Sequence, residues 1–216
     1  MRRGVKVMIS AGLALGLGGC LHSAPDYPGA SGSAIVPAQF ADAPCPDFSG
    51  TYEGLGQWIA GDGRNRWITR TLFFDYVFPA FIRDEMSNIE KNYIKGGPHR
   101  TWVPPDFAEV KTIGERSVKV TLRYGDKPIG SYHSDFSNKK TFVCTNDKLV
   151  WGAGDGAVSR SEFGPNTGDR SFAVYKDKNG DLIHERKQQV HMNLAFGIPV
   201  GTAKHFAVYR FKKIEK

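Results

Sequence analysis

The fold class is decided by the stretch Ser117-Val118-Lys119-Val120-Thr121-Leu122-Arg123-Tyr124. Its apolar side chains occupy every second position, and this period of two places one face of a strand inward and the other in water. Similar but weaker runs, rich in β-branched and aromatic residues, are found at 48–54, 67–76, 107–113, 129–136, 140–144, 148–151, 171–176, 182–194 and 205–211. Turn signals such as Gly125-Asp126 and Asn179-Gly180 separate them. The sequence therefore predicts a mainly β domain.

One helix is expected near 79–95. An apolar stripe with helical spacing runs through this segment, Pro79 suits a first turn, and Gly96-Gly97-Pro98 is a stop signal. The stripe consists of Ile82, Met86, Ile89 and Tyr93. About eight to ten short strands with one helix favour either a single antiparallel barrel or a sandwich.

The N-terminus has the pattern of a secretion signal. Arg2, Arg3 and Lys6 precede a short uncharged apolar run that ends at Leu17. A transmembrane helix is the alternative, but it needs about 20 apolar residues and this run is nearer to ten. We therefore expect residues 1–19 to be a signal peptide.

Leu17-Gly18-Gly19-Cys20 resembles the lipobox of bacterial lipoproteins, in which an apolar residue and two small residues precede the cysteine. The resemblance implies cleavage before Cys20 and modification of Cys20 by a diacylglyceryl group and an amide-linked fatty acid such as palmitate. Two or more acyl chains give stable membrane anchoring. Leu21 stands where an Asp would favour inner-membrane retention in such lipoproteins, which implies location in the bacterial cell envelope, at the outer membrane.

Residues 20–44 are expected to form a flexible tether, because they are rich in small residues and proline and have no hydrophobic period. Residues 45–216 suit a single domain. The formal charge of +7 falls to +4 without Arg2, Arg3 and Lys6, and the remaining basic residues are scattered. Nucleic acid is therefore not an expected partner.

The three cysteines support the same picture, because an exported chain with an odd cysteine requires an explanation. Acylation would account for Cys20. Cys45 and Cys144 would then meet an oxidising compartment and are expected to form a disulfide, with two separate buried thiols as the alternative.

The ends of the domain resemble those of lipocalins. Phe48-Ser49-Gly50-Thr51-Tyr52 is similar to the start of the first lipocalin strand, with Tyr52 where lipocalins have Trp, and Tyr209-Arg210-Phe211 is similar to the last strand. The resemblance implies a lipocalin-like (calycin-like) barrel in which Arg210 caps the ring of Tyr52 by a cation–π contact. The alternative is an unrelated sandwich.

Motifs for catalysis, metals and cofactors are weak throughout. Gly152-Ala153-Gly154-Asp155-Gly156-Ala157 fits a dinucleotide fingerprint but lacks the helix that must follow it. Ser137-Asn138-Lys139-Lys140 fits a nucleophile motif but leads into a predicted strand. The histidines are dispersed, so no metal site is expected. We expect no cofactor and no enzymatic activity, with a hydrolase of unknown substrate as the third of three hypotheses.

The aromatic run from Trp67 to Phe81 is the best candidate for a ligand site. Its candidate pocket-lining residues are Phe73, Phe74, Tyr76 and Phe78, although core packing explains them equally well. The favoured hypothesis is an anchored β domain that binds a hydrophobic small molecule. The second hypothesis is an envelope scaffold that contacts other envelope proteins without a ligand.

Overall fold

The computed structural model describes residues 42–62, 70–80, 82–96, 101–139, 141–145, 147–153, 159–161, 164–193 and 199–215. Its elements are β1 (Gly50–Glu53), β2 (Leu55–Gly61), β3 (Thr71–Phe73), the 3₁₀-helix η2 (Phe74–Tyr76), α2 (Arg83–Asn92), β4 (Lys95–Gly96), β5 (Thr101–Trp102), β6 (Phe107–Gly114), β7 (Ser117–Tyr124), β8 (Lys127–Asp135), β9 (Phe142–Cys144), β10 (Lys148–Ala153), β11 (Ser159–Ser161), β12 (Gly164–Lys176), β13 (Leu182–Asn193) and β14 (Pro199–Phe211). The prediction of a mainly β domain with a helix in the segment 79–95 is confirmed for the residues that the structure describes.

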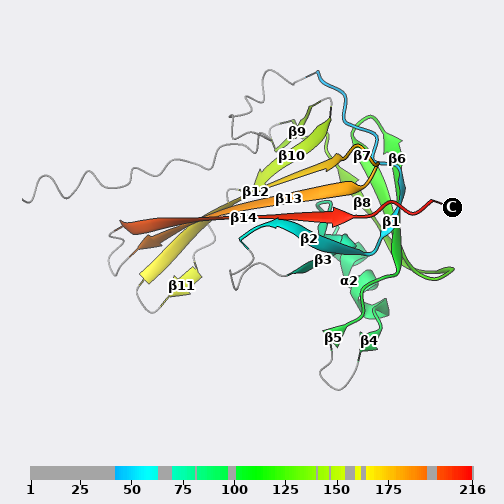
Figure 1. Ribbon diagram of the computed structural model, residues 1–216, viewed down its shortest axis with the longest axis horizontal. Helices are drawn as coiled ribbons and strands as arrows, with labels where there is room; N and C mark the ends of the chain where they lie inside the picture. Colours follow the sequence, from blue (N-terminus) through cyan, green and yellow to red (C-terminus); the bar gives the residue numbers. More distant parts are fainter. Residues whose placement is uncertain are drawn as a thin grey trace, which may run out of the picture.

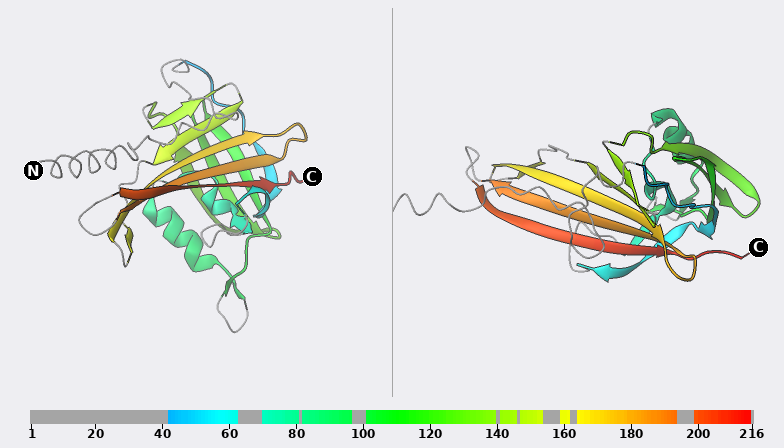
Figure 2. Two further views of the ribbon diagram at one scale, coloured as in Figure 1. Left: turned by 60° about the vertical axis from the view of Figure 1, so that its left-hand side comes forward. Right: turned by 90° about the horizontal axis from the view of Figure 1, so that it is seen from above.

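The strands form two main antiparallel sheets (Figure 1). One has the order β1-β6-β7-β8, and the other has the order β3-β2-β14-β13-β12-β10-β9, with β11 paired to β12. β4 and β5 form a separate short hairpin. The long strands β12, β13 and β14 run well beyond the four-stranded sheet (Figure 2).

The two sheets meet at β1 and the chain that follows β14. Glu53 N donates to the Lys212 carbonyl at 2.9 Å, and Ile214 N donates to the Thr51 carbonyl at 2.8 Å. Gly54 separates β1 from β2, and a Cβ atom there would overlap the backbone carbonyl of Pro105. Glycine is therefore required where the chain leaves one sheet for the other.

A single closed barrel is not formed by the strands that the structure describes. No ladder joins β8 to β9 among them, although Arg116 links their neighbourhoods by donating from Nε to the Phe136 carbonyl at 3.0 Å and from a terminal nitrogen to the Phe142 carbonyl at 3.3 Å. The arrangement is consistent with the sandwich alternative.

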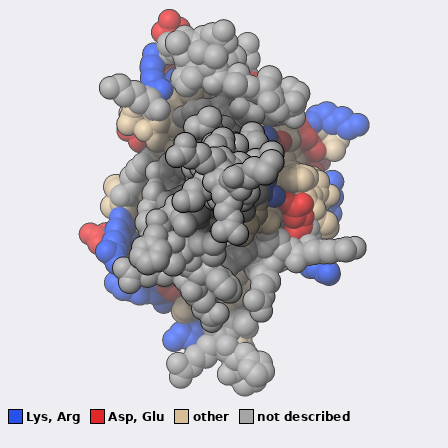
Figure 3. Space-filling view, turned by 90° about the vertical axis from the view of Figure 1, so that its left-hand side faces the viewer, with Lys and Arg blue, Asp and Glu red and all other residues tan. Residues whose placement is uncertain are grey.

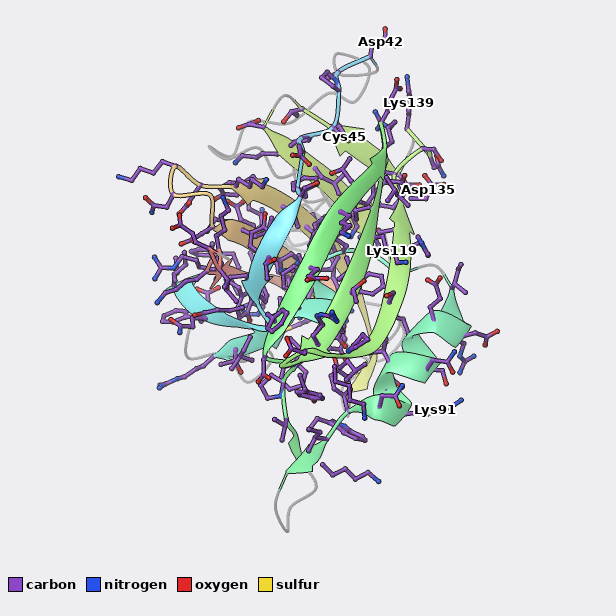
Figure 4. All side chains as sticks on the ribbon, turned by 90° about the vertical axis from the view of Figure 1, so that its right-hand side faces the viewer. Asp42, Cys45, Lys91, Lys119, Asp135 and Lys139 are labelled. Atoms are coloured by element: carbon purple, nitrogen blue, oxygen red, sulfur yellow. A yellow bond between two sulfur atoms is a disulfide. The ribbon has the colours of Figure 1, made fainter. Side chains whose placement is uncertain are left out.

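Cys45 and Cys144 form a disulfide with a Cα–Cα distance of 4.7 Å. It joins the segment before β1 to β9. Cys45 lies with Asp42 and Lys139 at one end of the four-stranded sheet, and Lys91 of α2 lies at the other end (Figure 4). The Lys139 ammonium lies 3.5 Å from the Asp42 carboxylate.

The core between the sheets is largely aromatic, and η2 lies inside it. Phe74 stacks on Tyr52 at 5.9 Å and packs edge-on against Phe211 at 5.0 Å, so it contacts both sheets. Phe78 packs in the same way against Phe48 at 5.4 Å. The strand predicted at 67–76 is therefore wrong in its second half, because burial of Phe74 turns the chain inward as η2. Residues 67–69 lie outside the described part of the chain.

α2 covers the end of the four-stranded sheet at β8 and is shorter than predicted, since it begins at Arg83 and ends at Asn92. Ile89 is fully buried against Gly130 of β8, where a Cβ atom would lie 2.5 Å from the Ile89 side chain. His133 N and Nδ1 each lie 2.9 Å from the Glu85 carboxylate. These contacts fix the helix and so place the residue that follows it, Tyr93, beside Phe73 of β3.

Candidate functional site

A cavity of about 550 Å³ lies between β3, η2, the end of α2, β5 and β13. This volume is within the range of about 300–1,000 Å³ that is typical of small-molecule sites. The cavity is lined by Thr71, Leu72, Phe73, Asp75, Tyr76, Glu90, Tyr93, Trp102 and Arg186.

One wall of the cavity is a row of three aromatic rings. Phe73 and Tyr93 have ring centroids 6.0 Å apart, and Tyr93 and Trp102 have ring centroids 6.1 Å apart. Tyr93 is nearly buried, whereas Trp102 is 46% exposed and Tyr76 is 63% exposed. The wall therefore continues from a covered floor to an apolar rim that solvent reaches.

Asp75 is a buried carboxyl at the cavity and is 4% exposed. Its pKa is raised from 3.8 to about 6, mainly by burial and also by the nearby charge of Glu90, while the Tyr93 hydroxyl opposes this shift. The Tyr93 hydroxyl lowers the pKa of Asp75, although the two groups do not have the geometry of a hydrogen bond. Neither Asp75 Oδ1 nor the Tyr93 hydroxyl has a partner in the described structure. Unpartnered buried polar atoms cost stability, and a bound ligand could satisfy them.

Arg186 brings a positive charge to the opposite strand, β13. Its pKa is lowered first by burial and then by the charge of Arg170 on β12. Arg186 does not lie within ion-pair distance of Asp75 or Glu90 among the described contacts. The cavity therefore has carboxyls and a guanidinium at separate places on a mainly apolar lining.

The four predicted pocket residues divide into two groups. Phe73 and Tyr76 line the cavity, whereas Phe74 and Phe78 are buried in the core between the sheets. Strand β3 ends at Phe73 and the 3₁₀-helix η2 begins at Phe74. This change of backbone conformation is what separates the two groups.

The predicted contact between Tyr52 and Arg210 is not formed. Tyr52 is buried, donates its hydroxyl hydrogen to the Phe48 carbonyl at 2.9 Å and stacks on Phe74. Arg210 lies between the buried residues Tyr209 and Phe211 on β14, so its side chain projects from the opposite face of the strand. The cation–π contacts that the described residues make are Lys95 over Trp102 and Lys148 over Tyr175.

Asp75, Glu90, Tyr93, Trp102 and Arg186 are among the cavity residues that the sequence analysis did not assign to a ligand site. A signal was present for Asp75, because it is the one charged residue in the apolar run Leu72-Phe73-Phe74-Asp75-Tyr76-Val77-Phe78. An acid in such a run requires either exposure or a special role. Trp102 and Arg186 carry no comparable signal, because they reach the cavity only through tertiary packing.

A second cavity, of about 790 Å³, surrounds the segment before β1 near Cys45 and Thr112. Asp47 Oδ1 accepts hydrogen bonds there from Ser49 N at 2.9 Å and from the Thr112 hydroxyl at 2.7 Å. These bonds lower the pKa of Asp47 to about 2. Because this carboxylate already has partners, the second cavity is the weaker candidate site.

Charge is mixed on the face at the far ends of β12 to β14, where the described Lys and Arg side chains lie around the margin together with Asp and Glu (Figure 3). No group of three or more His, Cys, Asp or Glu residues in the described ranges could hold a metal ion. None of the described helices is both long and apolar enough to cross a membrane.

The site thus combines an enclosed aromatic wall, an apolar rim and a few polar groups without partners. Searches against protein-family models, curated proteins and solved structures found no match to this chain.

Proposed function

We propose that this protein is a lipid-anchored protein of the bacterial envelope whose β domain binds a hydrophobic small molecule in the cavity beside Tyr93. The observation that carries the proposal is the aromatic wall of Phe73, Tyr93 and Trp102, which leads from a buried floor to an exposed rim. Natural ligand pockets have this composition, with mostly apolar walls and a few polar groups that fix orientation.

The strand order supports a barrel-like enclosure as the setting of the site. Most strands that follow one another in the sequence, from β6 to β10 and from β12 to β14, also pair with one another in the sheets. The exception is β8 and β9, which are not paired. β1 pairs with β6 on one edge and with residues after β14 on the other. We infer an incomplete barrel, whose open seam lies between β8 and β9 and is linked by the hydrogen bonds of Arg116.

The envelope location rests on the residues Leu17 to Cys20 and their resemblance to a lipobox. An acylated Cys20 would hold the domain beside a bilayer, where hydrophobic ligands are concentrated. Anchoring and ligand binding are therefore compatible parts of one function.

Binding can be tested with N-phenyl-1-naphthylamine, a neutral apolar dye whose fluorescence rises on leaving water. We expect the parent protein to bind the dye, and we expect Trp102→Ala to weaken binding roughly fivefold, because an aromatic contact contributes about 1 kcal/mol. Phe206→Ala is the matched control, since Phe206 is 45% exposed, close to the 46% of Trp102, and does not line the cavity.

Thermal unfolding of each variant checks that the fold is retained. A parent protein that leaves the dye in water would contradict ligand binding and would favour the envelope scaffold. Equal weakening by Trp102→Ala and Phe206→Ala would show that the dye does not occupy this cavity.

A further inference from the structure

Two arginines lie side by side on the inner face of the larger sheet. Phe172 of β12 pairs with Arg186 of β13, and Arg170 pairs with Gln188. Residues two apart on a strand share a face, so Arg170 is the diagonal neighbour of Arg186. Their closeness is also evident in the pKa of Arg186, which the charge of Arg170 lowers.

Neither guanidinium has an anionic partner within the described ranges. No hydrogen bond or ion pair of Arg170 or Arg186 is present there. Asp75 and Glu90 line the same cavity as Arg186 but form no ion pair with it among the described contacts, and Asp62 is engaged by His205 at 3.7 Å and by Phe206 N at 3.1 Å. Two like charges that are partly buried without a counter-ion are unfavourable, and an anion would relieve this cost.

His184 provides a second and independent observation. It precedes Arg186 by two residues on the same face of β13, is 2% exposed, and has no hydrogen-bond partner at Nδ1 or Nε2. Phe172 stacks on it at 5.9 Å, and the Tyr209 ring lies 6.4 Å away. A buried side chain with two unpartnered nitrogens is uncommon in a protein interior, and this one lies next to the two arginines without lining the cavity itself.

We propose that the cavity takes an amphiphile with an acidic head group, such as a long-chain carboxylic acid. This assignment rests on the binding function proposed above. The carboxylate lies between Arg186 and Arg170, because a guanidinium offers paired N–H donors that match two carboxylate oxygens. The apolar chain lies along the aromatic wall of Phe73, Tyr93 and Trp102, which shares the cavity with Arg186. Asp75 and Glu90, which also line the cavity without pairing with Arg186, would oppose an anion beside them and so favour one orientation of the chain.

The test compares two competitors of equal chain length, dodecanoate and dodecanol, for displacement of N-phenyl-1-naphthylamine at pH 8. We expect the parent protein to bind dodecanoate about tenfold more tightly than dodecanol. Arg186→Gln should abolish this preference, and Arg170→Gln should reduce it. Lys187→Gln is the matched control, because it removes the same charge from the next residue on the opposite face of β13.

Equal binding of dodecanoate and dodecanol by the parent would overturn the head-group assignment. The proposed function would still be supported in that case if the parent binds the dye. Loss of the preference in Lys187→Gln to the same extent would also overturn it, because the effect would then come from general positive charge. Failure of the parent to bind the dye or either competitor would overturn both proposals.

Discussion

The buried imidazole of His184 makes the stability of this domain sensitive to acid. Burial, with a contribution from the charge of Arg186, lowers the pKa of His184 from 6.5 to about 3. The unfolded chain therefore takes up a proton as the pH falls through 6.5, whereas the folded protein stays neutral there until the pH approaches 3. Stability is lost across this window as the pH falls.

The size of the loss follows from the two pKa values. Between pH 7 and pH 5, a shift from 6.5 to about 3 removes about 2 kcal/mol from the free energy of unfolding. Asp75 acts in the opposite direction, because its pKa is raised from 3.8 to about 6. Protonation of Asp75 in the folded state returns about 1 kcal/mol over the same interval. The parent should therefore lose only about 1 kcal/mol from these two groups.

His184→Phe removes the acid-sensitive group and keeps an aromatic ring beside Phe172. Any packing cost of the new ring is independent of pH, so the informative quantity is the change in the unfolding free energy between pH 7 and pH 5. Between pH 7 and pH 5, the unfolding free energy of His184→Phe should lack the loss of about 2 kcal/mol that the imidazole causes in the parent. Asp75→Asn should shift it by about 1 kcal/mol in the other direction.

Urea unfolding followed by circular dichroism at pH 5, 6 and 7 measures these differences by linear extrapolation. His184→Phe and the parent would show the same pH dependence if the imidazole were solvated or hydrogen-bonded in the folded state. That result would refute both the low pKa and the unpartnered environment on which it depends.

Three further predictions concern covalent links and backbone packing. Cys45→Ser should lower the free energy of unfolding by about 2–5 kcal/mol, because the disulfide closes a long loop, and should expose one free thiol after denaturation. Gly54→Ala should cost about 1–3 kcal/mol in urea unfolding, because its methyl group meets a backbone carbonyl, whereas Gly152→Ala, with ordinary contact distances, should cost less than half as much. Cys20→Ala should abolish labelling by radioactive fatty acid and release the protein from the membrane fraction, and retention as tight as that of the parent would contradict the lipid anchor.

The strands that the sequence predicts best are those whose two faces differ in polarity. β7 was predicted with the bounds that the structure has, Ser117–Tyr124, because Val118, Val120 and Leu122 are buried in alternation with more exposed residues. The glycines at its hairpin and at the β12–β13 hairpin, Gly125 and Gly180, have φ values of 52° and 79°. Local chemistry is sufficient for such elements.

β2 was missed because its stability comes from distant partners. The sequence Leu55 to Gly61 contains two glycines and a glutamine, and it has weak strand character by itself. It becomes a strand because it pairs with β14, about 150 residues away, and with β3. Gly56 also has a packing role, since a Cβ atom there would meet the Phe211 ring. Sequence periodicity carries no information on either partner.

The cavity was predicted only in part for a related reason. Phe73 and Tyr76 belong to one aromatic run and were identified by composition, but Tyr93, Trp102 and Arg186 come from three other elements. Their meeting depends on the register of β13 and on how closely Ile89 of α2 approaches β8. A change of one residue in that register would turn Arg186 to the outer face.

The position of the cavity relative to the predicted anchor connects these features. The chain enters the described domain near Asp42 and Cys45, at the end of the four-stranded sheet opposite to Lys91 of α2 (Figure 4). Trp102 of the rim belongs to β5, and the β4–β5 hairpin lies beyond α2, on the side of the domain away from the attachment point (Figure 1). A rigid short link would then hold the opening far from the bilayer. If residues 20–44 form the predicted flexible tether of roughly 25 residues, its mean reach would be about 25–30 Å. A tether of this length would allow the domain to turn its apolar rim to the membrane from which an amphiphile would enter.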